Sequence, residues 1–539
     1  MRILMVQLNP LVGDIPGNTR KLITAARRGL AEYQADVIVF PELVLTAYPP
    51  EDLLLRPSID RRISSALAEI RQAKIPAWLV VGHPSRHNKR LYNSLSVIHE
   101  DQCMAVYHKQ CLPNYQVFDE KRYFDAGTET CVLEIMGIPV AFSICEDLWE
   151  KGPMQAAAKV GAKLMINING SPFHKNKLAE RQAVIRERIQ ETGIPLVYVN
   201  QVGAQDELVF DGASMAYDAQ GELCAMAPLY EETMLPVDCE MNETELRMLP
   251  SDIAPLPEFL AGVYQALVLG LKDYVSKNRF SGVVLGLSGG IDSALTLAIA
   301  VDALGADRVH AVMMPYAYTS EMSLQDAQAE ARSLQVNYQV IPIAEIYNSF
   351  MQALSDEFAG TEMDITEQNI QARSRGVLLM AISNKKQLLV LTTGNKSELA
   401  VGYSTLYGDM AGGFDVLKDV PKMLVYELSR YRNSLEEVIP QRVIERPPSA
   451  ELAPGQVDED NLPPYELLDQ ILELYIEDDL SAEAIIDRGF EKAVVEQVIK
   501  LVDRNEHKRR QAPIGVRISR RGFGRDRRYP ITSGWKLGD

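Results

Sequence analysis

Short apolar runs and longer amphipathic stretches alternate along the first 245 residues. The apolar runs are rich in Val and Ile and are bounded by Pro, Gly or Asn, as is typical of buried strands. Amphipathic stretches at 19–33 and 178–192 predict helices between them. We therefore expect a layered α/β domain over residues 1–245. The predicted strands span residues 3–8, 37–40, 78–82, 95–99, 140–144, 164–168 and 196–200.

The pattern changes near residue 250, where Pro250, Pro255 and Pro257 follow one another closely. Proline lacks a backbone N–H and restricts the residue before it, so these prolines predict a stiff linker over residues 246–260. In the second domain, residues 261–539, strands again alternate with helices, which favours a doubly wound parallel sheet. A predicted helix at 258–277 leads into strands at 283–287, 309–314, 338–342 and 388–392, and a polar, proline-rich stretch at 446–464 predicts a mobile loop over a site.

The composition identifies a globular protein and excludes several other classes. Of the 539 residues 47% are apolar, which supplies a sizeable core, and Gly and Pro are not enriched, so collagen-like and low-complexity chains are excluded. No apolar run reaches the ~18 residues that cross a bilayer, so no membrane segment is expected. The six cysteines form no C-x-x-C pair and lack zinc-site spacing, so we expect a cytoplasmic protein with reduced thiols.

The net charge of −18 argues against sequence-independent binding to nucleic acid or to an anionic membrane. The charge is uneven, because residues 505–539 carry ten Lys or Arg against three Asp or Glu. This basic stretch is either a solvated tail or a local site for an anionic small molecule or an acidic neighbouring subunit.

Three polar residues lie beside buried apolar runs in the first domain: Glu42, Lys109 and Cys145. Taken singly, each has an ordinary structural interpretation: a solvated loop acid, a lysine that reaches water and a small buried side chain. Together they supply what a nucleophilic thiol needs, namely a base that deprotonates it and a positive charge beside the thiolate and the oxyanion it creates.

These residues and the sequences that flank them resemble those of the nitrilase superfamily over about residues 1–245. The resemblance rests on FPELVLTAYPPEDLL, HKQCLPNYQVFDEKRYF and SICEDLW, and on the opening QLNPLVGDIPGN. It implies an α-β-β-α sandwich in which Glu42 accepts the thiol proton, Cys145 attacks a carboxamide carbon and Lys109 stabilises the oxyanion. It also implies that Glu120 is a second acid near this triad, and that Tyr115, Ser171 and Lys177 contact glutamine.

In the second domain the segment LGLSGGIDS follows a predicted strand and opens a predicted helix. Small residues let backbone N–H groups approach phosphate oxygens, and a helix N-terminus favours negative charge, although a simple tight turn is the ordinary alternative. The segment lacks the lysine of a Walker A loop. Asp292 within it and Glu398, after the strand at 388–392, are candidate Mg²⁺ ligands at one sheet edge. The predicted ATP-binding loop consists of Leu285, Gly286, Leu287, Ser288, Gly289, Gly290, Ile291, Asp292 and Ser293.

This loop resembles the SGGxDS loop of the ATP pyrophosphatase family, which has the adenine nucleotide alpha hydrolase (Rossmann-like) fold and grips the pyrophosphate that leaves during adenylation. The segments NIQARSR, TTGNKSE, YGDMAGG, PSAEL and HKR, with Pro513, further resemble the NAD synthetase family. That resemblance implies that Thr393 contacts ATP. It also implies contacts to deamido-NAD from Asn369, Glu398 and Lys508, with Arg373, Asp409 and Lys422 as further contacts.

From end to end the chain resembles the glutamine-dependent NAD synthetase family. The implied reaction is ATP- and Mg²⁺-dependent amidation of deamido-NAD to NAD by way of an adenylate, with ammonia from L-glutamine. An enclosed passage for ammonia and a homo-oligomer are further expectations.

Two alternatives remain at this point. The first is an ammonia-only NAD synthetase with an inactive nitrilase-like interaction domain, and the intact Glu42, Lys109 and Cys145 argue against it. The second is another ATP-pyrophosphatase amidotransferase or an RNA-thiolating enzyme. The negative net charge and the lack of a C-x-x-C pair argue against RNA thiolation.

Overall fold

The computed structural model describes residues 1–242, 245–449, 451–453 and 462–535. The chain forms two compact units, Met1–Pro257 and Glu258–Asp539. Residues 246–248 of the expected linker form a strand of the first unit. All six cysteines carry free thiols. Among the described residues, every helix is too short or too polar to span a bilayer.

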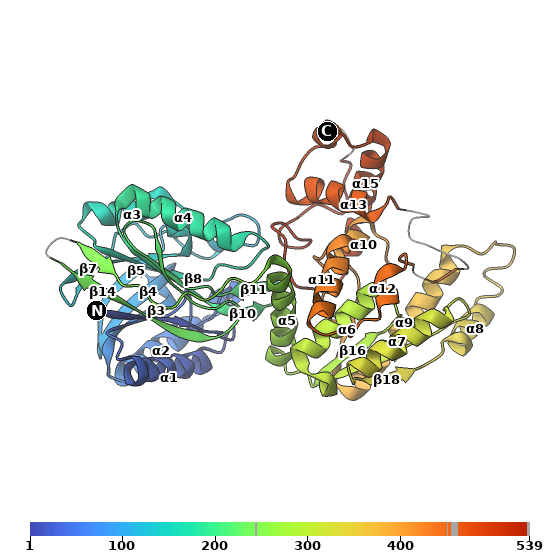
Figure 1. The fold of residues 1–539 in the computed structure, drawn as a ribbon, viewed down its shortest axis with the longest axis horizontal. Helices are drawn as coiled ribbons and strands as arrows, with labels where there is room; N and C mark the ends of the chain where they lie inside the picture. The colour runs from blue at the N-terminus through green and yellow to red at the C-terminus, as the bar shows by residue number, and fades with distance from the viewer. Residues whose placement is uncertain (243–244, 450, 454–461, 536–539) are drawn as a thin grey trace. The chain divides into compact units, whose positions relative to one another are not determined.

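The first unit is a sandwich of two sheets between two layers of helices (Figure 1). One sheet has the order β15-β14-β1-β2-β3-β4-β5 and the other β13-β12-β9-β8-β7-β6. The strands of the first sheet are β1 (Arg2–Gln7), β2 (Val37–Val39), β3 (Ile75–His87), β4 (Arg90–Glu100), β5 (Gln102–His108), β14 (Thr233–Met241) and β15 (Leu246–Met248). Those of the second are β6 (Val132–Ile135), β7 (Ile138–Ile144), β8 (Leu164–Asn169), β9 (Leu196–Asn200), β12 (Met215–Tyr217) and β13 (Leu223–Met226), and a hairpin of β10 (Val202–Gln205) and β11 (Leu208–Asp211) stands apart.

Alternating side chains build three hydrophobic layers in this unit, because successive residues of a strand point to opposite faces of its sheet. Met5 and Val39 meet Phe142 and Ile166 in the core between the sheets. The neighbouring residues of β1 and β2 pack outward against α1 (Ile15–Tyr33) and α2 (Ile59–Gln72). Helices α3 (Lys151–Lys159) and α4 (Lys177–Thr192) cover the other sheet. The expected α-β-β-α sandwich is therefore confirmed.

The second unit is built on a parallel sheet with the order β18-β17-β16-β19-β20, and every neighbouring pair is parallel. Val284, Val312 and Val390 pack on Leu379 of α9, which places α9 on one face. Helix α6 contacts β16 and β17, and it also packs against α5 and α11. The strands are β16 (Gly282–Gly286), β17 (Val309–Met313), β18 (Asn337–Val340), β19 (Leu388–Thr392) and β20 (Phe414–Asp415). The helices are α5 (Phe259–Lys277), α6 (Ile291–Leu304), α7 (Glu321–Ser333), α8 (Ala344–Ala353), α9 (Ile365–Lys386), α10 (Lys396–Val401), α11 (Lys422–Leu435), α12 (Gln441–Glu445), α13 (Tyr465–Leu472), α14 (Ala482–Ile486), α15 (Lys492–Arg504) and α16 (Glu506–Arg509).

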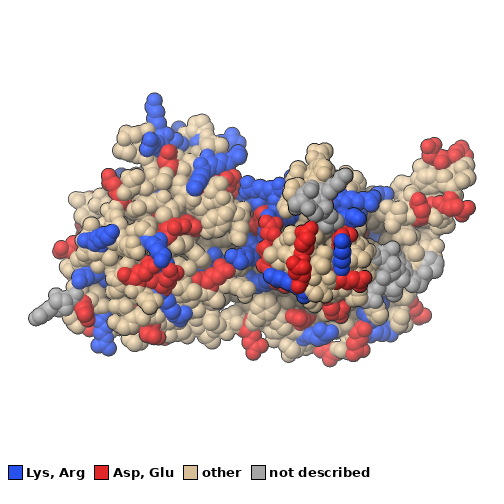
Figure 2. Space-filling view, turned by 90° about the horizontal axis from the view of Figure 1, so that it is seen from above, with Lys and Arg blue, Asp and Glu red and all other residues tan. Residues whose placement is uncertain are grey.

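The basic C-terminal stretch is partly folded into the second unit. Arg509, Arg517 and Arg527 are buried and pair with acidic residues of the same region, with distances of 2.8 Å from Arg509 to Glu506 and 2.6 Å from Arg517 to Asp526. A buried guanidinium needs such a partner, since its desolvation is otherwise uncompensated. A solvated tail therefore does not describe these three arginines. On the face drawn in Figure 2, basic side chains are interspersed with acidic ones.

Candidate functional site

Cys145 occupies a strained turn at the end of a buried strand. β7 ends at Ile144, and Cys145 opens the short 3₁₀ helix η3 (Cys145–Leu148) with a φ of +45°. A non-glycine residue in this left-handed region costs energy and is held by its surroundings. The side chain is buried, with 4% of its surface exposed.

Asp147 supplies that restraint. One carboxylate oxygen accepts the Ile144 N–H at 3.0 Å and the Tyr107 hydroxyl at 2.8 Å. The other accepts the N–H groups of Gln110 and Cys111 at 3.0 and 2.7 Å. Asp147 therefore ties the turn that carries Cys145 to the backbone directly after Lys109. Sequence reasoning missed it, although it stands two residues after the cysteine in the quoted SICEDLW segment.

Lys109 joins two glutamates. Its side chain is fully buried. Its ammonium donates to an oxygen of Glu42 and to an oxygen of Glu120, both at 2.8 Å. Glu42 also accepts the amide of Asn93 at 2.7 Å and the Gly170 N–H at 2.8 Å, so three donors hold its carboxylate. The structure thus brings Glu42, Lys109 and Glu120 together as the sequence predicts.

Burial and the neighbouring charges set the protonation of this cluster. Burial raises the pKa of the Cys145 thiol, Glu42 raises it further and Lys109 opposes both. Burial likewise raises the pKa of Glu120 to about 7, against the pull of Lys109. Burial works against the charge of Lys109, but Glu120 and Glu42 outweigh it and raise the pKa of the ammonium. The resting thiol is therefore protonated at neutral pH, and it needs a nearby proton acceptor to become a nucleophile.

Tyr115 and Lys177 lie close enough to Cys145 to interact with its charge. The Tyr115 hydroxyl donates to the Glu146 carboxylate at 3.0 Å. The Lys177 ammonium lies 3.8 Å from the centre of the Trp149 ring, and burial lowers its pKa. A cation on an indole face is a stabilising contact, and the same ammonium lies 3.4 Å from an oxygen of Glu180.

Ser171 belongs to the same wall of the site. It follows Gly170, whose N–H donates to Glu42, and its hydroxyl accepts Arg181 Nε at 3.1 Å. Arg181 is fully buried and pairs with Asp211 at 2.7 Å. The structure thus places Tyr115, Ser171 and Lys177 around the Glu42–Lys109–Cys145 cluster.

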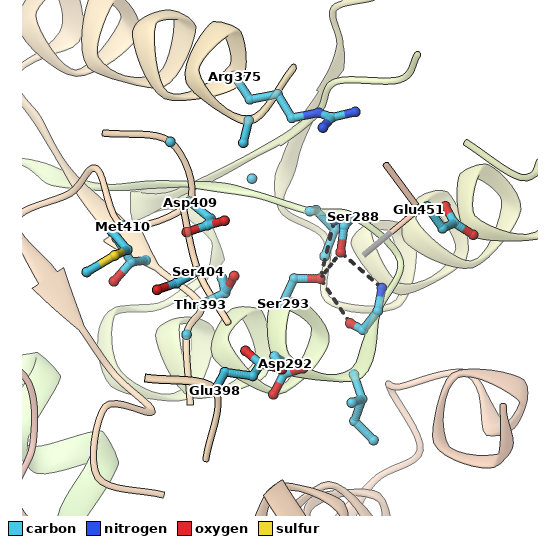
Figure 3. A pocket seen from close by; sticks show the side chains of 18 of the residues that line it. Ser288, Asp292, Ser293, Arg375, Thr393, Glu398, Ser404, Asp409, Met410 and Glu451 are labelled. Atoms are coloured by element: carbon cyan, nitrogen blue, oxygen red, sulfur yellow. Dashed lines mark hydrogen bonds between the residues drawn. The ribbon is translucent and has the colours of Figure 1, made fainter. Parts of the chain in front are cut away.

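The phosphate-loop segment turns between β16 and α6 and keeps its own shape by hydrogen bonds (Figure 3). The hydroxyls of Ser288 and Ser293 are 3.1 Å apart, and Ser293 donates to the Gly290 carbonyl at 2.9 Å. Gly289 has a φ of +79°, and a Cβ there would lie 2.4 Å from the Ser323 carbonyl oxygen. Only glycine fits this position, because a side chain would be strained and would also clash.

A cavity of about 290 Å³ opens above this loop, at the carboxyl ends of the parallel strands. This is where open α/β sheets bind ligands. Of the predicted ATP-binding residues, Leu285 and Gly289 do not line it: Leu285 is buried in the sheet, and Gly289 packs against Ser323. The predicted residues that line the cavity are Gly286, Leu287, Ser288, Gly290, Ile291, Asp292, Ser293, Thr393, Glu398, Asp409 and Lys422.

Asp292 and Glu398 face each other across one ammonium group. Lys422 donates to Asp292 at 2.5 Å and to Glu398 at 3.0 Å. Asn395 fixes the same pair, since its amide donates to Asp292 at 2.8 Å and its carbonyl oxygen accepts the Glu398 N–H. Two carboxylates that converge on one cation, beside a loop suited to phosphate, form a donor set that fits Mg²⁺. Sequence reasoning missed Asn395, which looks like an ordinary helix cap.

A second cavity of about 1070 Å³ is lined by Asn369, Arg373, Asp409 and Lys508. Burial raises the pKa of Asp409 to about 6. Lys508 donates to the carbonyls of Gly402 and Ser404, both at 2.8 Å. Asp409 and Ser404 line both cavities, whereas Glu398 lines the first cavity and not the second.

The N-terminal part of the expected loop at 446–464 lies beside the phosphate loop. Arg446 donates to the Gly289 carbonyl and to Ser323. Glu451 accepts the hydroxyls of Ser320 and Ser323 at 2.9 and 2.8 Å. Residues 450 and 454–461 of this stretch lie outside the described residues.

Comparison with known proteins matches both halves of the chain. The carbon-nitrogen hydrolase family model matches residues 2–247, and the NAD synthase family model matches residues 263–512. The glutamine-dependent NAD(+) synthetase of Acinetobacter baylyi is 48% identical over an alignment that covers 100% of this chain and 99% of that protein. The enzyme of the same name from Thermotoga maritima is 44% identical, with 99% of each chain covered.

Solved structures agree with this assignment. A glutamine-dependent NAD+ synthetase from Acinetobacter baumannii, in complex with ADP, is 47% identical and has a TM-score of 0.80, with 100% of this chain and 99% of that chain covered. A glutamine-dependent NAD(+) synthetase from Cytophaga hutchinsonii, 22% identical with a TM-score of 0.86 and 99% and 98% coverage, has the same fold. This chain therefore belongs to the glutamine-dependent NAD(+) synthetase family.

Proposed function

We propose that this chain converts deamido-NAD to NAD with ATP and with ammonia that its first unit releases from L-glutamine. The observation that carries the proposal is the strained Cys145 turn, placed in a buried cluster with Glu42, Lys109 and Glu120. This cluster can generate a thiolate and stabilise an oxyanion. The second unit of the same chain carries a phosphate-loop cavity, and a relative 47% identical to this chain has been solved with ADP.

In the glutaminase half, Glu42 accepts the proton of Cys145 as the sulfur attacks the carboxamide carbon of glutamine. The Lys109 ammonium offsets the negative charge on the oxygen of the tetrahedral intermediate. The C–N bond then breaks, ammonia leaves with the proton, and a thioester remains on Cys145. Water attacks the thioester, with Glu42 or Glu120 accepting its proton, and glutamate leaves. Glu146, Tyr115, Ser171 and Lys177 bind the charged end of glutamine.

In the synthetase half, the nicotinate carboxylate of deamido-NAD attacks the α-phosphorus of ATP, and pyrophosphate leaves into the loop at Ser288–Ser293. Ammonia then attacks the acyl carbon and AMP leaves, which yields NAD. Mg²⁺, held by Asp292 and Glu398, would offset the charge of the phosphate oxygens. Thr393 binds ATP. Asn369, Arg373 and Lys508 bind deamido-NAD in the second cavity, and Glu398 contacts it from the first cavity. Asp409, which lines both cavities, is proposed as a further contact.

The proposal is tested with Cys145→Ala, supplied with either glutamine or ammonium. Loss of the nucleophile should lower glutamine-driven NAD formation by about 10³-fold or more, and ammonium-driven formation should stay at the wild-type rate. Cys103→Ala, at an exposed thiol, is the matched control and should change neither reaction. Equal loss with both donors would contradict the assignment of Cys145. A wild type that uses ammonium alone would favour the alternative of an inactive nitrilase-like domain.

The homo-oligomer expected from the resemblance is also part of the proposal. Light scattering behind size-exclusion chromatography measures the mass of the assembly in solution. A monomer at micromolar concentration would contradict the proposed homo-oligomer and would leave the catalytic assignments unchanged.

A further inference from the structure

The two carboxylates assigned to Mg²⁺ already hold a cation of the chain itself. The Lys422 ammonium lies 2.5 Å from an oxygen of Asp292 and 3.0 Å from an oxygen of Glu398. Lys422 is 1% exposed, and the Asp292 and Glu398 side chains are each 17% exposed. All three line the cavity above the phosphate loop.

The geometry around Lys422 leaves these groups little freedom. Lys422 is the first residue of α11, and its backbone N–H donates to the Ser397 hydroxyl at 2.9 Å. Its ammonium also lies 5.3 Å from the centre of the Tyr465 ring. Asn395 holds Asp292 by its amide and caps the backbone of Glu398. The two acids are thus preorganised, and the ammonium stands between them.

An ammonium and a divalent ion cannot share this place. Two largely buried carboxylates beside an open cavity would attract a divalent cation by themselves, because their charges are poorly screened there. The Lys422 ammonium between the two carboxylates cancels one of their two negative charges. A metal can bind both carboxylates directly only if the ammonium moves away. A nucleotide supplies the new partner, since its phosphate oxygens can accept the ammonium while they add ligands to the metal.

We propose that Lys422 is a positioning residue whose ammonium occupies the metal position between Asp292 and Glu398. It prevents a divalent metal from binding these carboxylates until a nucleotide phosphate binds the ammonium instead. This inference rests on the proposed function for the identity of the metal ligands. It assigns Lys422 to the nucleotide side of the site, in place of the expected contact to deamido-NAD. Metal and nucleotide then bind together rather than one after the other.

The same unit offers a matched control in Lys396. Its ammonium also lies between two buried carboxylates, at 2.9 Å from Asp419 and 2.8 Å from Glu477. Lys396, Asp419 and Glu477 do not line either of the two cavities described. Removing this lysine leaves a buried acidic pair away from the phosphate loop.

The test measures binding of Mn²⁺ to the full-length protein without nucleotide, from the loss of the paramagnetic signal of free Mn²⁺. Lys422→Met should tighten the affinity for Mn²⁺ by about tenfold or more relative to wild type, because a competing charge is gone. Lys422→Arg keeps a cation and should leave the affinity weak, as should Lys396→Met. The double variant with Asp292→Asn and Lys422→Met should lose the gain. With a non-hydrolysable ATP analogue, the wild type should bind Mn²⁺ tightly.

An Mn²⁺ affinity of Lys422→Met no tighter than that of wild type would overturn the inference, as would an equal gain in Lys396→Met. Circular dichroism and the thermal melting profile report whether each variant is folded. Lys422→Gln, which retains donors for the two carboxylates without a charge, provides the same comparison if Lys422→Met does not fold. If wild type with the ATP analogue binds no Mn²⁺, the metal ligands of the proposed function are wrong. If wild type binds Mn²⁺ with the analogue but Lys422→Met gains no affinity without it, only the role of Lys422 is wrong.

Discussion

Single residues in the glutaminase site act through the neighbours that hold them. Cys145 sits in a left-handed backbone conformation, and its thiol has a pKa raised by burial. Neither property is useful unless the sulfur is held beside Glu42 and Lys109. Asp147 does this, because its two oxygens together accept four donors from both sides of the site.

Asp147→Asn tests this positioning role. An asparagine has one acceptor oxygen, so its NH₂ group would face donors that Asp147 now satisfies. We expect glutamine hydrolysis to fall by about 100-fold in kcat, since small displacements of a nucleophile cost that much. Ammonium-driven NAD formation should remain at the wild-type rate.

The measurement is the glutaminase rate beside the ammonium-driven rate for the same preparation. Asp101→Asn, in the exposed turn after β4, is the control and should alter neither. If Asp147→Asn hydrolyses glutamine like the wild type, the carboxylate does not position Cys145.

The role of a residue can be predicted from the sequence where the local segment around it is characteristic. It cannot be predicted where the role depends on tertiary contacts. Glu42, Lys109 and Cys145 stand at strand ends with recognisable neighbours, and the structure gathers Glu42 and Lys109 beside the thiol as expected. Asp147 and Asn395 look like ordinary loop and cap residues until their partners, which are distant in sequence or on other elements, are known. Lys422 is a further case, since its partners Asp292 and Glu398 are 130 and 24 residues away.

At the scale of elements, hydrophobic periodicity predicts strand positions well and strand lengths less well. The apolar run at 78–82 marks only the middle of β3, and the run at 95–99 marks only the second half of β4. The two strands continue as a long antiparallel hairpin through Ser85, Arg86 and Tyr92. Backbone pairing does not require apolar side chains, so the polar ends carry no hydrophobic signal. The basic stretch at the C-terminus shows the same limit, because the burial of Arg509 and Arg527 follows from partners that a charge count does not reveal.

The loop between β16 and α6 allows a test in which one helix supplies its own control. Gly289 and Gly305 flank α6, and both have positive φ, +79° and +82°. A Cβ at Gly289 would lie 2.4 Å from the Ser323 carbonyl oxygen, whereas a Cβ at Gly305 would meet nothing within 4 Å. Both alanine variants carry backbone strain of about 1–3 kcal/mol, but only Gly289→Ala must also shift the loop.

We therefore expect Gly289→Ala to raise the KM for ATP by about tenfold or more with either nitrogen donor, since the loop N–H groups lose their alignment. Gly305→Ala should lower the melting temperature slightly and leave the KM for ATP unchanged. Basal glutamine hydrolysis should survive in both variants. An equal effect of the two variants on ATP would show that strain, and not the contact with Ser323, governs the loop.

At the scale of the whole molecule, two candidate sites lie on one chain. The first unit has a buried thiol with an acid–base cluster, and the second has a phosphate-loop cavity next to a larger cavity. The layered sandwich and the parallel sheet follow from the alternation of strands and helices, which is why the fold is predictable from the sequence. The expected passage of ammonia from one site to the other is a statement about the assembled protein and stays a prediction.

The central claim is that the nitrogen of NAD comes from glutamine by way of Cys145. The measurement is the isotopic mass of NAD formed from deamido-NAD, ATP and Mg²⁺ with glutamine labelled by ¹⁵N at the side-chain amide and with unlabelled ammonium present. The wild type should incorporate ¹⁵N into the carboxamide of NAD, and Cys145→Ala should form only unlabelled NAD from ammonium. Labelled NAD from Cys145→Ala, or only unlabelled NAD from a wild type that hydrolyses glutamine, would contradict the account.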